Sequence, residues 1–305
     1  MDRRKFIKTI VGGTVVVGTS LASGNSSRLL AAAIEPPAYD LVAVKGGEPE
    51  QMFDRAMTSL GGIEQFIAKG SKVVVKPNIG WDVEPDRGGN TNPRLVRRII
   101  DQCLAAGARE VSVFDHTCDA WQRCYTNSGI EQAVKDAGGK MVPANNEGYY
   151  QTVTVDRGKR LREAKVHELI LDADVFINVP VLKHHTSSMV TIGMKNLMGI
   201  VWDRWYWHRN DLHQCIADFV SCSKPTLTVV DAYTVMKQNG PRGVSIGDVV
   251  KMKSLVVSTD PVAADAAAAL IFGTNPADIR HIQLAADMGL GQMDLQRLSI
   301  DRIKM

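Results

Sequence analysis

The sequence contains few cysteines and few aromatic residues. Aromatic side chains make up 6% of the 305 positions, and the five cysteines include no C-x-x-C pair. That absence excludes the common ferredoxin-type runs that bind iron–sulfur clusters. Cys118 with Cys124, or Cys215 with Cys222, could close a disulfide in an oxidising compartment. The alternative is that these cysteines are small buried hydrophobic residues.

The main part of the chain also lacks an excess of charge of either sign. Of the 36 basic and 33 acidic residues, five basic and one acidic residue lie in positions 1–33. The remaining 31 basic and 32 acidic residues give a net charge of −1. Binding to a phosphate backbone requires a basic surface. The sequence therefore predicts no nucleic-acid partner.

Basic residues gather instead at the N-terminus, ahead of an uncharged segment. Arg3 and Arg4 precede the stretch 9–27, which is only mildly apolar because glycine, serine and threonine dilute it. This arrangement resembles a twin-arginine export signal, with a small-residue cleavage site at 31–33. We therefore expect a signal peptide at 1–33, the twin-arginine export machinery as a partner, and a periplasmic or otherwise exported protein. The alternative is an uncleaved anchor, so that the chain contacts the membrane only through this segment.

Beyond the signal, positions 34–305 have the pattern of a single α/β domain. Short β-branched runs alternate with helical segments, as in a mainly parallel sheet with helices on both faces, a three-layer arrangement. Asn–Pro or Asp–Pro pairs, which cap helices and fill the first helical position, precede three of the helical segments. The expected strands are 41–45, 72–76, 110–114, 174–181, 226–230 and 254–258. The expected helices are 93–106, 129–137, 211–222, 261–273 and 277–288.

Distinctive polar residues follow the expected strands. Ligands of parallel sheets bind beyond the carboxyl ends of the strands, so side chains at those ends should gather at one edge. The sequence therefore predicts a single site at that edge. The residues concerned are Asn78, Asp115, His116, Lys183, His184, His185, Asp231, Thr259 and Asp260.

The segment 181–199 holds the densest group of such residues. Lysine is almost never buried without a partner, so we expect Lys183 and Lys195 to face a ligand, a carboxylate or water. We interpret them as the charges of an anion-binding pocket, in which Thr191 and Asn196 are hydrogen-bond donors. The alternative is a surface segment that leaves its lysines in solvent.

Two roles compete for the histidines, because histidine is both an acid–base group near neutral pH and a common metal ligand. His184 and His185 are adjacent and cannot point the same way in regular structure. A divalent or transition metal, if bound, would be held by Asp115, His116 and His184, with Asp231 as a further candidate. No spaced metal-binding motif occurs, so this prediction depends only on the strand-end positions.

Two further segments are candidates for the wall of the site. The loop 239–243 contains Gly240, which could let the backbone approach a ligand, although the same sequence is typical of a plain turn. It matches no nucleotide-binding glycine motif. The segment 202–209 contains three tryptophans, including Trp205, and we interpret it as a lid-like loop that stacks on a substrate. Asp265, one turn into an expected helix, is interpreted as a buried acid that has its own partners.

Several motifs stand in a characteristic order between positions 70 and 291. They are V-V-K-P-N (74–78), V-P-V-L-K-x-H (179–185), T-x-x-x-K-N-L-M-G (191–199), G-P-x-G (240–243) and D-P-V-A-A-D (260–265). Together they resemble the bacterial and archaeal family called domain of unknown function 362. The resemblance points to His185 as the family's matching histidine, and it implies no settled reaction. Many relatives carry an additional ferredoxin-like cluster domain, which this sequence lacks.

These observations predict an exported enzyme that acts on a small anionic organic substrate, by a reaction that the sequence does not define. Hydrolysis and proton transfer both fit such a site. The alternatives are a metal- or cofactor-dependent redox protein and a non-catalytic periplasmic ligand-binding module. The candidate catalytic residues are Lys183, His185, Lys195 and Asp231. The candidate substrate-binding residues are Lys76, Asn78, Thr191, Asn196, Gly240 and Trp205.

Overall fold

The computed structural model describes residues 38–305, in which strands and helices alternate along the chain. The signal peptide predicted at 1–33 lies outside the described residues. The strands are β1 (Leu41–Lys45), β2 (Lys72–Pro77), β3 (Glu110–Val113), β4 (Lys140–Met141), β5 (Tyr150–Thr154), β6 (Glu163–His167), β7 (Val175–Val179), β8 (Val181–His185), β9 (Met189–Thr191), β10 (Leu227–Met236), β11 (Val249–Ser258) and β12 (Ile300–Lys304). The α-helices are α1 (Pro49–Ser59), α2 (Pro93–Ala105), α3 (Trp121–Asn127), α4 (Ile130–Asp136), α5 (Glu168–Asp172), α6 (Gly193–Asn196), α7 (Arg204–Arg209), α8 (Leu212–Val220), α9 (Pro261–Phe272) and α10 (Arg280–Asp287).

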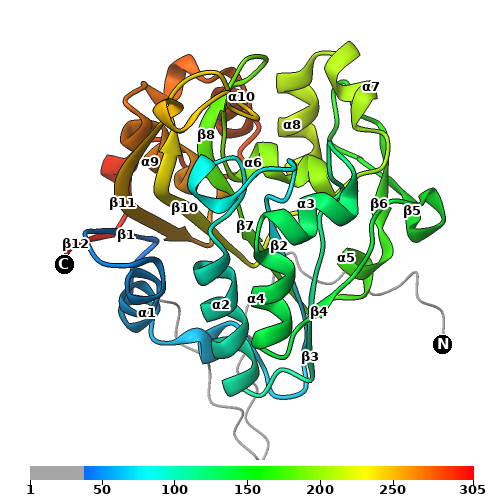
Figure 1. Ribbon diagram of the computed structural model, residues 1–305. Helices are drawn as coiled ribbons and strands as arrows, with labels where there is room; N and C mark the ends of the chain where they lie inside the picture. The colour runs from blue at the N-terminus through cyan, green and yellow to red at the C-terminus, as the bar shows by residue number, and fades with distance from the viewer. Residues whose placement is uncertain (1–37) are drawn as a thin grey trace, which may run out of the picture. The chain divides into compact units, whose positions relative to one another are not determined.

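The central sheet is mainly parallel and has the strand order β12-β1-β11-β10-β7-β2-β3-β4 (Figure 1). Along the order β10-β7-β2-β3-β4, each strand pairs in parallel with the next. Strand β11 runs antiparallel to both β1 and β10. The predicted class is therefore confirmed, with one long strand reversed. Because of that reversal, Thr259 and Asp260 lie at the opposite edge of the sheet from the other polar residues that follow strands.

Helices cover both faces of the sheet, which gives three layers (Figure 1). One apolar core holds the inward residues of α1, α2 and α4, such as Phe53 and Ile99. The other holds those of α6, α8, α9 and α10, such as Phe219 and Ile282. Every residue of β7 is buried, because this strand lies between the two cores. No helix in the range 38–305 combines the length and the apolar character needed to cross a bilayer.

Helix ends follow the capping pattern of the sequence. The Asn92 side chain accepts a hydrogen bond from the Arg94 backbone N–H at 3.0 Å, and Pro93 fills the first position of α2. The Asp260 side chain likewise caps α9. The segment 277–288, predicted as one helix, divides into a 3-10 turn and α10, because the backbone at Ile279 is extended.

The run 174–181, predicted as one strand, divides at Pro180. Proline has no N–H for the sheet, and the chain changes partners at this point. Strand β7 pairs with β2 and β10, whereas β8 pairs with β10 and with the short β9. This change of direction brings Lys183 and His185 to the carboxyl end of the sheet beside β2.

Candidate functional site

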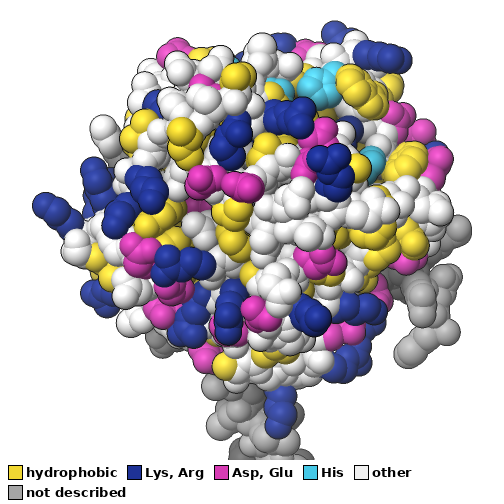
Figure 2. All heavy atoms as spheres, in the orientation of Figure 1, with side chains coloured by type: hydrophobic (Ala, Val, Ile, Leu, Met, Phe, Trp, Pro, Cys, Tyr) yellow, Lys and Arg dark blue, Asp and Glu magenta, His cyan; other side chains and the backbone are white. Residues whose placement is uncertain are grey.

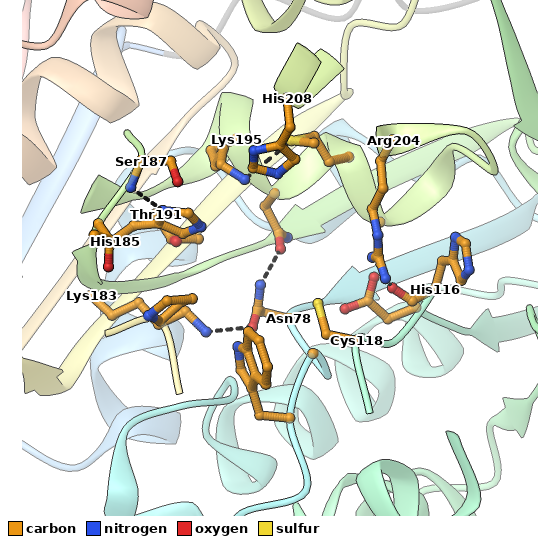
Figure 3. Close-up of a pocket in the computed structure, with 18 of the residues that line it drawn as sticks. Asn78, His116, Cys118, Lys183, His185, Ser187, Thr191, Lys195, Arg204 and His208 are labelled. Carbon is orange, nitrogen blue, oxygen red and sulfur yellow. Dashed lines mark hydrogen bonds between the residues drawn. The ribbon is translucent and has the colours of Figure 1, made fainter. Parts of the chain in front are cut away.

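A cavity of about 480 Å³ lies at the carboxyl ends of β2 and β8 and is bounded by α6 and α7 (Figure 3). This volume is typical of sites for small molecules. In Figure 2, histidine and basic side chains reach the surface together in the upper part of the face shown. The cavity collects ten of the thirteen side chains singled out in the sequence. They are Lys76, Asn78, Asp115, His116, Lys183, His185, Thr191, Lys195, Asn196 and Trp205.

The short helix α6, which carries two of these residues, is held in place by a buried carboxylate. Asp265 in α9 accepts hydrogen bonds from the backbone N–H groups of Gly193 (2.7 Å) and Met194 (3.0 Å). Burial raises the pKa of Asp265 to about 7, and these two bonds act in the opposite direction. This contact fixes the position of Lys195 and Asn196 on the cavity wall. Asp265 is thus a buried acid with its own partners, as the sequence indicated.

Three asparagines, of which Asn178 and Asn196 are buried and Asn78 is half-buried, form a chain of hydrogen bonds at the cavity wall. The Lys183 ammonium donates to Asn78 Oδ1 at 3.0 Å, and Asn78 Nδ2 donates to Asn196 Oδ1 at 2.9 Å. Asn196 Nδ2 donates to Asn178 Oδ1 at 2.8 Å, and Asn178 Nδ2 donates to the Gly193 carbonyl at 2.9 Å. Each amide accepts on one side and donates on the other, so its orientation is fixed by its neighbours. The chain therefore holds Lys183 in a single position.

Lys76 is a buried lysine with its own carboxylate. Its Nζ lies 3.0 Å from Asp115 Oδ1 and donates to the backbone oxygen of Asn196 at 2.7 Å. Burial lowers the pKa of Lys76, and Asp115 acts in the opposite direction. Asp115 Oδ2 also accepts the Ile79 backbone N–H at 2.7 Å. A side chain on Gly199 would strike Asp115 Oδ1 at 1.8 Å, so this packing requires glycine.

Lys183 and Lys195 have no carboxylate partner within residues 38–305, although both are buried, with only 1% and 8% of their surface exposed. Lys183 donates to Asn78 Oδ1 and to the carbonyl of Gly89. Lys195 contacts the sulfur of Met198 at 3.1 Å, and a thioether is a weak acceptor. Burial lowers the pKa of Lys183 to about 7 and that of Lys195 to about 8. The cavity thus holds two titratable amines with unused capacity to bind an anion.

Two histidines face these amines and are neutral. Burial, with the charges of Lys195 and Lys183 beside it, lowers the pKa of His185 to about 2. Burial, again with Lys195, lowers that of His208 to about 4. The Ser187 backbone N–H donates to His185 Nδ1 at 3.1 Å. His185 therefore carries its proton on Nε2 and serves as a neutral donor.

Most of the segment 202–209 is the helix α7, which begins at Arg204, and the prediction of a lid-like loop was wrong. Within α7, Trp207 is buried in the core, whereas Trp205 is 69% exposed and lines the cavity. Arg204 and His208, four residues apart, share the cavity side of the helix. The guanidinium of Arg204 donates to the backbone oxygens of His116 and Thr117. The sequence interpretation missed Arg204 and His208, although helical spacing in this segment would have placed them together.

Three predicted site residues do not line the cavity. Asp231 is buried, and its carboxylate accepts the backbone N–H groups of Asn92 (2.7 Å) and Tyr233 (3.0 Å). Its role is therefore to join β10 to the start of α2, and the catalytic assignment is withdrawn. Gly240 packs against β8, where its N–H donates to His184 Nδ1 at 3.1 Å. A Cβ at Gly240 would lie 2.0 Å from the His184 carbonyl oxygen, so this glycine serves close packing.

The predicted metal ligands are not assembled into a site. Asp115 is paired with Lys76, and His116 Nδ1 lies 3.0 Å from the Val201 carbonyl. His184 points to the Gly240 loop instead of the cavity. In the part of the chain that the structure describes, no three His, Cys, Asp or Glu side chains are grouped to hold a metal ion.

Comparisons with known proteins place this site in a family. The chain is 27% identical over 239 residues to the thylakoid-associated protein sll1697 of Synechocystis sp. (strain ATCC 27184 / PCC 6803 / Kazusa), covering 76% of this chain and 72% of that protein. It also superposes on the lactate racemase apoprotein from Thermoanaerobacterium thermosaccharolyticum with a TM-score of 0.47 and 12% identity. That match covers 72% of this chain, which spans about half (54%) of the racemase chain.

The family match covers the segment that builds the cavity. It runs over residues 73–270, from β2 through α9, and so includes both lysines without carboxylates and the helix that holds α6. The chain therefore belongs to the family described as Domain of unknown function (DUF362).

Proposed function

We propose that the protein is an enzyme that binds a small organic anion in this cavity and transfers a proton to or from it. The observation that carries the proposal is the pair of buried lysines, Lys183 and Lys195, that share one cavity and have no carboxylate partner in the described residues. Buried charges require compensation. Arg204 adds a third positive charge at the wall. An anionic ligand would supply the missing negative charge.

Lys183 is suited to the proton transfer. A neutral amine has two N–H groups and one lone pair, and two fixed acceptors, Asn78 Oδ1 and the Gly89 carbonyl, take up the two N–H groups. The third position on the Lys183 nitrogen carries a lone pair when the amine is neutral and an N–H group when it is protonated. The pKa of about 7 means that both forms are populated near neutral pH, the condition for an efficient acid–base group.

Lys195 is suited to binding the charge of the substrate. Within residues 38–305 its Nζ has only the Met198 sulfur as a hydrogen-bond partner, so its donors remain available. An anion beside it raises the pKa of Lys195 and keeps it protonated. The neutral Nε2–H of His185 and the hydroxyl of Thr191 line the same cavity and supply uncharged donors. Lys195 therefore supplies the charge that binds the substrate, whereas His185 and Thr191 supply the hydrogen bonds that orient it.

The proposal is tested with a panel of mono- and dicarboxylates, hydroxy acids and sugar phosphates. Binding is measured by thermal shift, and each binder is then incubated with the protein in D₂O and followed by proton NMR for exchange or product. We expect Lys195→Met to lose binding at least tenfold, since one charged contact is removed. Lys183→Met is expected to abolish exchange while a fold check by circular dichroism is unchanged.

Lys135→Met, an exposed lysine in α4, is the matched control and should behave as the wild type. Binding that survives both cavity substitutions at full affinity would contradict the proposal. Binding without exchange or product for any member of the panel would show a ligand-binding module instead of an enzyme.

We also propose that the protein is exported by the twin-arginine route. The support is the sequence of positions 1–33, with Arg3-Arg4 ahead of an uncharged segment. Replacing both arginines by lysine should leave the protein in the cytoplasmic fraction of its host, whereas the wild-type chain appears in the exported fraction. Equal distribution of the two forms would contradict this proposal without bearing on the cavity.

A further inference from the structure

The cavity contains one thiol, that of Cys118, which the proposed function does not use. Cys118 lies in the loop between β3 and α3, is exposed, and lines the cavity. Figure 3 shows its sulfur directed in among the lining side chains. Neither disulfide considered from the sequence, Cys118–Cys124 or Cys215–Cys222, is formed. Cys124 is buried, with its Sγ 3.8 Å from the Gly80 carbonyl. Cys118 is therefore a free thiol at the mouth of a binding site.

The loop holds this thiol in a defined place. The Cys118 backbone N–H donates to the Gly80 carbonyl at 2.8 Å, which ties the loop to the chain that follows β2. Thr117 Oγ1 donates to the Asp119 carbonyl at 2.7 Å, and Asp119 Oδ2 accepts the Asp82 N–H at 3.2 Å. Both neighbours of the cysteine are thus anchored, and its side chain is left facing the cavity.

Two of the positive charges that share the cavity with the thiol, those of Lys183 and Lys195, lack a carboxylate partner in the described residues, whereas Lys76 is paired with Asp115. Cys118 lines the same cavity as Lys183 and Lys195. A negative charge on its sulfur would favour the charged form of both amines, against the effect of burial, which lowers their pKa values. The sulfur is therefore within electrostatic reach of both amines. Lys195 beside the thiol points to a ligand, because only 8% of the residue is exposed and its Nζ contacts only a thioether in the described residues. A thiolate close to lysines is a nucleophile.

We propose that Cys118 forms a covalent bond with anionic carbon electrophiles that Lys183 and Lys195 bind in the cavity. The inference rests on the proposed anion site and adds the class of reactive group. In the step, the thiolate sulfur attacks the carbon of the bound electrophile. The sulfur–carbon bond forms as the bond to the leaving group breaks, and the leaving group departs with the electron pair. The proton of the thiol has passed to the buffer before the attack.

Iodoacetate and iodoacetamide test the proposal, because they differ in charge and share the same reactive carbon and the same iodide leaving group. The alkylation rates at Cys118 and at the other exposed cysteine, Cys222, are measured by peptide mass spectrometry, with 2-mercaptoethanol as a free reference thiol. The quantity compared is the iodoacetate-to-iodoacetamide rate ratio, which cancels differences in thiol ionisation. We expect the ratio at Cys118 to exceed that of the free thiol about tenfold or more, and to fall with added salt.

Substitutions show whether the charge of Lys195 causes the raised rate ratio at Cys118. Lys195→Met should bring the Cys118 ratio close to the reference value, whereas the exposed Lys135→Met should leave it unchanged. A Cys118 ratio equal to that of 2-mercaptoethanol in the wild type would overturn the proposal. If the carboxylate panel still binds in that case, the anion site stands and only the covalent step fails. If neither binding of the carboxylate panel nor a raised ratio is found, both the proposed function and the covalent step fail.

Discussion

Two buried carboxylates, Asp231 and Asp265, differ from two buried lysines, Lys183 and Lys195, in what compensates their charge. Asp231 and Asp265 each accept two backbone N–H groups, of which those to Asp265 and one of those to Asp231 come from another segment of the chain. In the described part of the chain, Lys183 and Lys195 donate to neutral oxygen or sulfur atoms. The carboxylates are satisfied within the fold, and the lysines are not. Burial of a charged residue therefore does not identify a site, whereas the absence of a counter-charge does.

The same difference gives the two groups opposite dependences on pH. Burial raises the pKa of Asp231 to about 6 and that of Asp265 to about 7. A carboxyl group with a raised folded-state pKa binds more protons when folded, so its contribution to stability falls as pH rises from about 4 to 7. For Lys183 and Lys195 the folded-state pKa is lowered, so unfolding takes up protons. Their contribution to stability rises from about pH 7 towards pH 10.

The largest expected effect is the loss of a satisfied carboxylate. Asp265→Ala leaves two buried backbone N–H groups without an acceptor, and we expect it to lower the free energy of unfolding by about 3 kcal/mol. Asp156→Ala, at an exposed position, is the control and should change it by less than about 0.5 kcal/mol. Urea denaturation measures both. Equal stability of the two variants would show that the α6–α9 contact contributes little.

A smaller effect is expected from pH on the protein without ligand. Between pH 7 and pH 9 its free energy of unfolding should rise by about 2 kcal/mol, because the buried lysines are neutral at the higher pH. The double variant Lys183→Met, Lys195→Met should lack most of this rise. Urea denaturation across the pH range provides the test, and parallel curves for wild type and double variant would contradict the assignment of both lysines.

Removing a neutral hydrogen-bond partner of Lys183 should change the pH profile of the reaction more than the free energy of unfolding. Asn78→Ala takes away the acceptor of the Lys183 ammonium, which lowers the pKa of Lys183 further. The pH profile of exchange or turnover should therefore move down by about one unit. Asn127→Ala, an exposed residue of α3, is the control. An unchanged profile in Asn78→Ala would mean that Lys183 does not carry the proton.

The smallest effect is expected at the rim of the cavity. Trp205 is 69% exposed, so Trp205→Ala should leave the free energy of unfolding within about 0.5 kcal/mol of the wild type. Loss of its contact with a bound anion should weaken binding by about 1 kcal/mol. Tyr206→Ala, on the same helix but outside this cavity, tests whether the effect is specific. Equal weakening by both would indicate a general change in α7.

The alternation of apolar runs and capped helices was sufficient to predict the layers and the edge of the sheet that carries the site. The segment 181–199 also stood out, because lysines follow a fully apolar strand there. The direction of β11 could not be predicted, since a short β-branched run has the same pattern in a parallel and an antiparallel strand. This is why Thr259 and Asp260 were grouped with the site in error.

The sequence also could not predict which atoms the buried side chains contact. Nothing in the run T-V-V-D-A shows that the Asp231 carboxylate would bind the N–H group of Asn92, because that contact joins segments far apart in the chain. Arg204 and His208 were missed for a different reason. Three tryptophans within six positions suggested a loop, whereas the fold uses one ring for the core and another for the rim.

Proton uptake on binding tests the central claim most directly. Calorimetry of the tightest-binding carboxylate at pH 8, in two buffers of different ionisation enthalpy, gives the number of protons taken up with the ligand. If the anion binds beside Lys183 and Lys195, it raises the pKa of both, and we expect an uptake of about one proton that decreases in Lys183→Met. Tight binding with no proton uptake, in the wild type as in the variant, would show that these lysines are not the anion site.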